Sequence, residues 1–282
     1  MKPFRDILLT VDFDRTLTGP DSVIPQRNLE AIDYFMENGG AFTVNTGRST
    51  ATFWQYLDTL SVNAPFLLYN GSAAYENGGL KQCVPIAMDP WETMSTMKRL
   101  FPDMNLEIQG TSRHYLIDPQ PEMVALYEKM QWRYTMATFG EDFGPFLKFS
   151  LFGKPYEPVV ATFFVAEAEE LRRFDEAEQA IRDLYGDRVE VFRAAPRIID
   201  VHAKGVSKIN AARTLQKELG RRILICVGDA ENDITMLDGA DYAFCPADGV
   251  VAQRYPNVCP CGEGAVADVI YKKIPEILTN EP

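Results

Sequence analysis

The fold of this chain is decided by the stretch Ile7-Leu8-Leu9-Thr10-Val11-Asp12-Phe13-Asp14, in which an apolar run ends in two carboxylates. The run is typical of a buried strand, and ligands of open α/β sheets bind at the carboxyl ends of such strands. Two carboxylates there suit a hard cation. The stretch therefore favours a site that handles phosphoryl groups, although a solvated turn at a strand end is an alternative, since aspartate is common in turns.

Three further segments place polar side chains at the ends of predicted elements. The apolar run 222–227 leads into Gly228-Asp229-Ala230-Glu231-Asn232-Asp233, and the short β-branched run Thr43-Val44 leads into Asn45-Thr46-Gly47-Arg48. Ser207-Lys208 opens a helical stretch. The four element ends together offer carboxylates, a hydroxyl, a guanidinium and an ammonium. This combination, in this order, indicates phosphoryl chemistry far more specifically than any one segment does.

The first part of the chain alternates between strand and helix signals. An amphipathic segment, Pro25 to Asn38, ends at two glycines, and Ser49 to Leu60 begins at a serine cap. Phe66 to Tyr69 reads as a third strand that stops at Asn70-Gly71, a turn signal. The order βαβαβ predicts a doubly wound parallel sheet of the Rossmann-like α/β class.

The middle of the chain reads differently. Strands are predicted over 106–109, 114–117, 147–152 and 160–165, and helices over 121–132 and 168–185. These elements favour an α+β domain inserted into the core. We therefore expect a core formed by residues 1–82 and 194–282, with a cap domain over 83–193.

Five motifs carry a resemblance to a known family: DFDRTLT, NTGRS, YNGSAAY, VHAKGVSK and VGDAENDITML, which follow one another from Asp12 to Leu237. In them the chain resembles the haloacid dehalogenase-like phosphohydrolases, in particular the Cof-like subgroup of capped sugar-phosphatase type. That subgroup carries a large α/β cap after the third core strand. The resemblance implies a Mg²⁺-dependent phosphatase that hydrolyses a small phosphomonoester through an aspartyl-phosphate.

The resemblance also assigns roles to individual residues. Asp12 is the expected nucleophile, Asp14 the general acid and base, and Lys208 the charge-neutralising lysine. The residues expected to bind the substrate are Thr46, Gly47, Arg48 and Asn232. Those expected at the metal are Asp12, Asp14 through its backbone carbonyl, Asp229 and Asp233. Asp233 has two open roles, because it can hold a metal-bound water or orient Lys208.

Several of these assignments have alternatives. Arg48 suits bidentate phosphate binding or a structural ion pair, and Thr16 suits a role in fixing the loop. Lys204 lies four residues before Lys208 but is out of register with the family pattern, so a solvated loop position is expected for it. The chain departs from the pattern at Arg15 and Ile209, where glycine is common, and at Pro246, where asparagine is usual. None of these departures removes a catalytic carboxylate.

The composition of the chain restricts the classes of protein to which it can belong. The 282 residues are 46% hydrophobic, which is enough for two cores. The net charge of −12 argues against binding along a nucleic-acid backbone. The chain lacks an apolar stretch long enough for a bilayer or a signal peptide, so a cytoplasmic monomer or homodimer without membrane or nucleic-acid partners is expected. Five cysteines fit reduced thiols, and Cys259-Pro260-Cys261 is expected to be a structural loop.

Specificity is expected to reside in the insertion, and two other functions stay open. The candidates for recognising the leaving group are Arg113, His114, Arg133, Lys148 and Arg193, with aromatic residues around Trp132. A phosphotransferase or mutase would pass the same aspartyl-phosphate to a second hydroxyl. A protein that binds phosphorylated ligands without catalysis would keep the fold and lose the rate. A phospho-aspartate receiver domain is disfavoured by the inserted region and by the spacing of the acidic pair.

Overall fold

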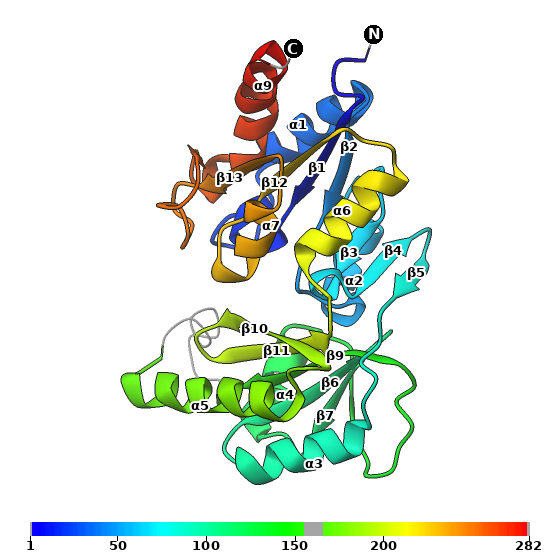
Figure 1. The fold of residues 1–282 in the computed structure, drawn as a ribbon, viewed down its shortest axis with the longest axis vertical. Helices are drawn as coiled ribbons and strands as arrows, with labels where there is room; N and C mark the ends of the chain where they lie inside the picture. Colours follow the sequence, from blue (N-terminus) through cyan, green and yellow to red (C-terminus); the bar gives the residue numbers. More distant parts are fainter. Residues whose placement is uncertain (1, 155–165, 281–282) are drawn as a thin grey trace. The chain divides into compact units, whose positions relative to one another are not determined.

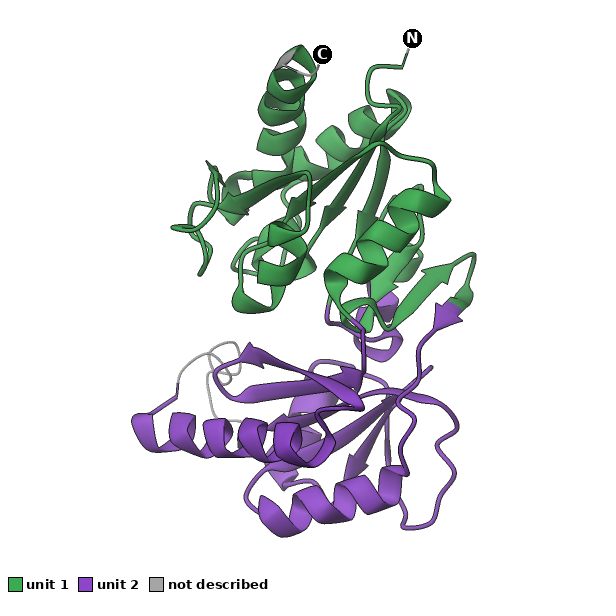
Figure 2. Ribbon diagram, viewed as in Figure 1, with its two compact units in different colours: residues 1–46, 57–81, 207–282 green, residues 47–56, 82–206 purple. Residues whose placement is uncertain are grey.

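A computed structural model describes residues 2–154 and 166–280 of the chain. The chain forms two compact units, which Figure 2 distinguishes by colour. Unit 1 comprises residues 1–46, 57–81 and 207–282, and unit 2 comprises residues 47–56 and 82–206. Each unit contains its own β-sheet.

The sheet of unit 1 is parallel throughout. Its strand order is β14-β13-β12-β1-β2. The strands are β1 (Ile7–Val11), β2 (Ala41–Val44), β12 (Ile223–Val227), β13 (Tyr242–Pro246) and β14 (Asn257–Val258). β1 lies between β2 and β12 and is completely buried, as its unbroken apolar run predicts. The predicted parallel α/β core is thus confirmed (Figure 1).

Helices cover both faces of this sheet, and in Figure 1 α6 and α7 lie in front of the strands. The helices are α1 (Gln26–Glu37), α6 (Lys208–Glu218), α7 (Ile234–Asp238), α8 (Ala265–Asp268) and α9 (Ile274–Asn280). Short helical turns are η1 (Phe13–Leu17), η2 (Tyr69–Gly71), η4 (Glu231–Asp233), η5 (Cys261–Glu263) and η6 (Val269–Lys273). Leu215 of α6 and Met236 of α7 share a core cluster with Leu8 and Leu224. This packing fixes the N-terminus of α6 near the carboxyl ends of β1 and β12.

A small sheet follows β2 in the chain. It contains β3 (Phe66–Leu68), β4 (Ala73–Glu76) and β5 (Gly79–Cys83), and β3 pairs with β4 in antiparallel fashion. A parallel bridge between Asn45 and Leu67 places β3 beside the end of β2. The predicted third strand is therefore present and next to β2.

Unit 2 contains a six-stranded sheet of order β10-β11-β9-β6-β7-β8. The strands are β6 (Asn105–Gly110), β7 (His114–Ile117), β8 (Tyr134–Met136), β9 (Phe146–Phe152), β10 (Val189–Ala195) and β11 (Ile198–Ala203). All neighbours pair in antiparallel fashion except β7 and β8. One face packs Ile108, Phe149 and Val201 into a large apolar cluster.

The described helices of unit 2 are α2 (Thr50–Leu57), whose last residue belongs to unit 1, α3 (Pro90–Leu100), α4 (Pro121–Lys129) and α5 (Ala168–Tyr185). α5 has the bounds that the sequence predicts, and α2 and α4 each end three residues before the expected end. The strand expected over 160–165 lies outside the described residues. Within the two described ranges, none of the helices is long and apolar enough to cross a membrane.

Candidate active site

The pairing of β1 with β12 brings two acidic segments to one sheet edge. The strands run in parallel with Val11 opposite Val227, so both end at the same level. Asp12 follows β1 directly, and its backbone N–H donates to the carbonyl of Val227 at 2.8 Å. Asp229 lies two residues beyond β12. The carboxylates that the sequence places at strand ends are therefore neighbours in space.

Three buried carboxylates form a cluster at this edge. Asp12, Asp229 and Asp233 each offer an oxygen, and these oxygens lie within 4.8 Å of one another. The ammonium of Lys208 enters the cluster from the start of α6: Nζ lies 2.5 Å from Oδ1 of Asp12 and 2.6 Å from Oδ1 of Asp233. Only 1% of the lysine side chain is exposed. The arrangement is a buried, closely spaced set of charges with an excess of negative charge.

Asp233 accepts hydrogen bonds from the loop that carries Asp229 as well as from Lys208. Its Oδ2 accepts hydrogen bonds from the backbone N–H groups of Asp229 and Ala230, at 3.0 and 3.1 Å. A Cβ atom at Gly228 would lie 2.6 Å from Cβ of Asp233, so glycine is required for this close approach. With both of its oxygens occupied in this way, Asp233 holds Lys208 and the loop that carries Asp229.

The cluster shifts the pKa values of its members. Burial raises the pKa of Asp12 to about 7, against the opposing effect of Lys208, and the charges of Asp233 and Asp14 raise it further. Burial also raises the pKa of Asp229 to about 8, again with contributions from the neighbouring carboxylates. Burial lowers the pKa of Lys208, but the charges of Asp12 and Asp233 outweigh this effect, so its pKa is raised and it stays protonated.

The donor set fits a divalent metal ion. Buried carboxylates with raised pKa values are under-compensated charges, and one lysine balances only part of the charge of three carboxylates. A hard dication with oxygen ligands, such as Mg²⁺, would complete the balance. Thr16 adds a hydrogen bond from Oγ1 to Oδ1 of Asp229, at 3.2 Å. A bond of this kind orients a metal-ligating carboxylate.

Asp14 lies in the loop η1, just beyond the cluster. Its side chain is half-buried, and its charge contributes to the raised pKa of Asp12. Arg15, the next residue, has a φ of +59°, which favours glycine and explains why the related motif has glycine there. The backbone N–H of Arg15 donates to Oγ1 of Thr18 at 3.1 Å, which braces the loop. Among the described residues, the cluster of mutually close oxygens does not include Asp14.

The expected substrate-binding residues are divided between the two units. Thr46 is buried in unit 1, where its N–H donates to the carbonyl of Leu67 and its own carbonyl accepts from Asn70 N–H, both at 2.9 Å. Gly47 and Arg48 begin the first segment of unit 2 and are half-buried. Asn232 is half-buried in η4, on the loop that carries Asp229 and Asp233.

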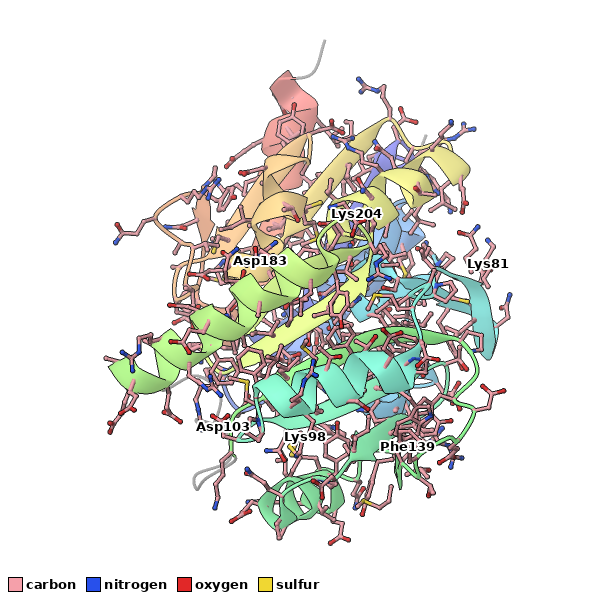
Figure 3. All side chains as sticks on the ribbon, turned by 60° about the horizontal axis from the view of Figure 1, so that its bottom comes forward. Lys81, Lys98, Asp103, Phe139, Asp183 and Lys204 are labelled. Carbon is pink, nitrogen blue, oxygen red and sulfur yellow. The ribbon has the colours of Figure 1, made fainter. Side chains whose placement is uncertain are left out.

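The two competing lysines have different environments. Lys204, which Figure 3 labels, is an exposed residue. It belongs to unit 2, and its ammonium pairs with Glu190 at 3.2 Å. Lys208 is buried among the carboxylates. Of the two lysines, Lys208 is therefore the one that contacts the acidic cluster. Ile209 packs closely against Gly239, where an added Cβ atom would lie 2.4 Å from Cγ1 of Ile209.

The side chains proposed to recognise a leaving group make contacts inside unit 2. Nε2 of His114 lies 2.5 Å from Oγ of Ser49, and Nδ1 lies 2.7 Å from the hydroxyl of Tyr127. Lys148 is buried, with Nζ 3.0 Å from Asp200 Oδ2 and 3.1 Å from the carbonyl of Gly47.

The arginines and cysteines singled out in the sequence also make local contacts. Arg113 donates to Thr135, Arg133 lies over the ring of Trp54 at 4.8 Å, and Arg193 pairs with Asp175 and Glu178. Cys259 and Cys261 are free thiols, and Cys261 Sγ donates to Asp248 at 3.2 Å.

Comparison with known proteins identifies the family. The sequence profile described as haloacid dehalogenase-like hydrolase matches residues 9–251, which include all five motifs. The chain belongs to the haloacid dehalogenase-like hydrolases. The family predicted from the motifs is thus confirmed, and the acidic edge of unit 1 lies within the matched residues.

Distant relatives in this family align over nearly the whole chain. An uncharacterized hydrolase from Schizosaccharomyces pombe is 23% identical, covering 95% of this chain and 91% of that protein. A 5-amino-6-(5-phospho-D-ribitylamino)uracil phosphatase from Bacillus subtilis is 19% identical, covering 90% of each. The solved structure of a sugar phosphatase of subclass IIB matches with a TM-score of 0.72 and 18% identity, covering 95% of this chain and 99% of the other. The structural match confirms the predicted fold class.

Proposed function

We propose that this hydrolase is a Mg²⁺-dependent phosphatase that cleaves a small phosphomonoester through an aspartyl-phosphate on Asp12. The observation that carries the proposal is the buried ammonium of Lys208 between Asp12 and Asp233, beside the third carboxylate of Asp229. A carboxylate nucleophile that must approach a phosphate dianion needs such charge compensation. A purely structural cluster of this kind would be costly, because buried charges seldom stabilise a fold.

The first chemical step forms the intermediate. A carboxylate oxygen of Asp12 attacks phosphorus while the bond from phosphorus to the leaving oxygen breaks. Asp14, on the adjacent loop, gives its proton to that leaving oxygen, and such a transfer contributes about two to four orders of magnitude in rate. Lys208 stabilises the charge that develops on the phosphoryl oxygens.

The second step restores the enzyme. Asp14, now a carboxylate, takes a proton from water as the water oxygen attacks phosphorus. The bond between phosphorus and the Asp12 oxygen breaks, which releases phosphate and the free carboxylate. A half-buried position suits Asp14 for both transfers, since it must reach the leaving group first and water afterwards.

The metal ion would be held by Asp12, Asp229 and the backbone carbonyl of Asp14. When bound, Mg²⁺ neutralises charge on the phosphoryl oxygens and helps to orient the substrate. Thr16 would orient Asp229 for this purpose, and Asp233 would orient Lys208. We assign substrate phosphate binding to Thr46, Gly47, Arg48 and Asn232.

The substrate class follows from chemistry and from the relatives. A strongly acidic protein must capture a phosphorylated metabolite with a local cationic group, which Lys208 would provide. Relatives named for a sugar phosphatase and for the phosphatase of a ribitylamino-uracil phosphate support a sugar phosphate or a phosphorylated cofactor precursor. We propose that the inserted region, residues 83–193, acts as a cap domain that selects the leaving group.

The test is phosphate release from a panel of phosphorylated metabolites, with Mg²⁺ or with a chelator. Release that requires Mg²⁺ and disappears in Asp12→Asn supports the proposal. Turnover in heavy-oxygen water separates hydrolysis from transfer, because label enters phosphate only when water is the acceptor. Absence of release from every ester, with the fold intact by circular dichroism, would contradict a phosphatase and favour a transferase or a binding protein.

A further inference from the structure

Asn45 connects the strand of the nucleophile to the helix of the lysine. It is the first residue beyond β2, and it is completely buried. Its backbone N–H donates to the carbonyl of Val11, the residue before Asp12, at 2.8 Å. Its side-chain Nδ2 donates to the backbone carbonyl of Lys208 at 2.9 Å. One residue thus contacts the main chain beside both members of the ion pair.

We propose that Asn45 is a positioning residue that sets the place of the Lys208 ammonium relative to Asp12. The inference rests on the proposed function, because it assigns catalytic value to that ammonium. The side-chain amide of Asn45 donates to the backbone carbonyl of Lys208 and not to a carboxylate of the cluster, so it acts through the backbone of Lys208.

The position of the lysine depends on the first turn of α6. Lys208 is the first residue of this helix, and Ser207 caps it by accepting a hydrogen bond from the N–H of Asn210 at 3.2 Å. On another side, a Cβ atom at Gly71 would lie 2.6 Å from the carbonyl oxygen of Ser207, so the turn η2 packs closely there. Asn45 adds the directional contact that ties this turn to the sheet. A small displacement of the turn would lengthen both short bonds of the ammonium.

The amide oxygen of Asn45 argues against a purely stabilising role for this side chain. In the part of the chain that the structure describes, Oδ1 of Asn45 is buried without a hydrogen-bond partner. Burial of an unpaired amide oxygen costs free energy, and an apolar side chain of similar size would avoid that cost. Nδ2 also lies 3.6 Å from Sδ of Met236, a residue of the apolar core. The hydrogen bond to Lys208 is therefore the contact for which the amide is needed.

The test compares Asn45→Leu with Asn63→Leu, a change in the loop before β3 whose side chain bonds to the start of β2. Asn63 also uses its amide to bond backbone: Nδ2 donates to Gly40 and Oδ1 accepts from Phe42, both at 2.8 Å. We expect Asn45→Leu to lower kcat for p-nitrophenyl phosphate by about tenfold or more with a smaller change in KM, because the ammonium acts mainly on the transition state. We expect Asn63→Leu to lower thermal stability without changing kcat. Equal kcat values for Asn45→Leu and wild type would overturn the proposal.

A double-mutant cycle with Lys208→Met identifies the route of the effect. If Asn45 acts through Lys208, Asn45→Leu has little further effect on kcat in the Lys208→Met background. Fully additive losses in the two variants would overturn the positioning role. If Asn45→Leu does not fold, Asn45→Ala in the same cycle decides the question.

Crystal structures test the positioning role of Asn45 independently of the proposed phosphatase activity. Displacement of Nζ of Lys208 from Asp12 in Asn45→Leu supports the positioning role, and an unchanged ion pair contradicts it. This readout needs no turnover. A wild-type enzyme that releases no phosphate would therefore reject the phosphatase proposal, while the structures would still decide the role of Asn45.

Discussion

The ammonium of Lys208 lies 2.5 Å from Oδ1 of Asp12, and both side chains are almost completely buried. Two residues 196 positions apart in the chain therefore form one charged unit at the edge of the sheet. The fold itself holds the ammonium at this carboxylate, and a charge held in place in this way needs little reorganisation as charge develops during phosphoryl transfer.

Replacing Lys208 by methionine should disable the site. We expect kcat to fall by about 100-fold or more, since an electrostatic contact to the transition state is lost. We also expect a loss of about 3–5 kcal/mol of stability near neutral pH, because two buried carboxylates lose their partner. Phosphate release and thermal unfolding measure the two effects. Lys204→Met is the control: its ion pair is exposed, so it should leave both quantities nearly unchanged.

Replacing Asp14 by asparagine should separate the two chemical steps. p-Nitrophenolate leaves without a proton, whereas attack by water still requires a base. We therefore expect a burst of about one p-nitrophenolate per enzyme, followed by slow turnover. Stopped-flow absorbance measures the burst. Asp12→Asn should give no burst, and a linear time course in Asp14→Asn with the wild-type rate would exclude Asp14 as the acid and base.

Removing the hydroxyl of Thr16 should weaken metal binding. Thr16→Val keeps the shape and removes the hydrogen bond to Asp229. We expect the affinity for Mg²⁺ to fall by about tenfold, as is usual for residues that orient a ligating carboxylate. Isothermal titration calorimetry gives the affinity. Thr10→Val is the matched control, because in the described structure that buried hydroxyl has no partner; equal affinities in both variants would refute the role of Thr16.

The effect of Mg²⁺ on stability should depend on pH. A carboxyl whose pKa is raised on folding binds its proton more tightly in the folded state, so its contribution to stability is lost as pH rises. For Asp12 this loss extends from about pH 4 to about pH 7, and for Asp229 it extends from about pH 4 to about pH 8. A bound dication replaces these protons. We expect Mg²⁺ to raise the unfolding temperature more at about pH 8 than at about pH 6.

The control for this prediction is the Asp229→Asn variant, in which the effect of Mg²⁺ on the unfolding temperature is compared at the same two pH values. This variant removes one of the two titrating carboxyls, so the difference between the two pH values should shrink. Calorimetry with and without Mg²⁺ measures it. An increase in unfolding temperature that is the same at both pH values in the wild type would show that these carboxyls do not hold the ion.

Local sequence signals account for much of the fold. β1 is predictable because an apolar run of strand length ends at charged residues, and α5 because its apolar residues have helical spacing after a capping box at Glu167. The hairpin of β4 and β5 is also predictable from the sequence. Asn77-Gly78 is a strong turn signal, and both residues have positive φ. Likewise, Asp89 before Pro90 marks the start of α3, where Asp89 accepts from Glu92 N–H.

Long-range contacts explain what the sequence does not reveal about the site. The motifs predict that Asp12, Lys208 and Asp229 act together, but they do not predict the bond from Thr16 to Asp229, which spans 213 positions. The bond from Asn45 to the backbone of Lys208 spans 163 positions and involves a residue outside the expected catalytic set. Such contacts depend on how the strands and helices pack, which local patterns do not encode.

Acid quenching during turnover, followed by mass spectrometry of the peptide that contains Asp12, tests the covalent mechanism most directly. We expect a phosphoryl adduct on Asp12 that accumulates in Asp14→Asn, where its hydrolysis is slow. The same peptide from Asp12→Asn should carry no adduct, and that variant should release no phosphate. Sustained phosphate release by Asp12→Asn, or turnover by the wild type without an adduct on Asp12 in either enzyme, would contradict the covalent mechanism.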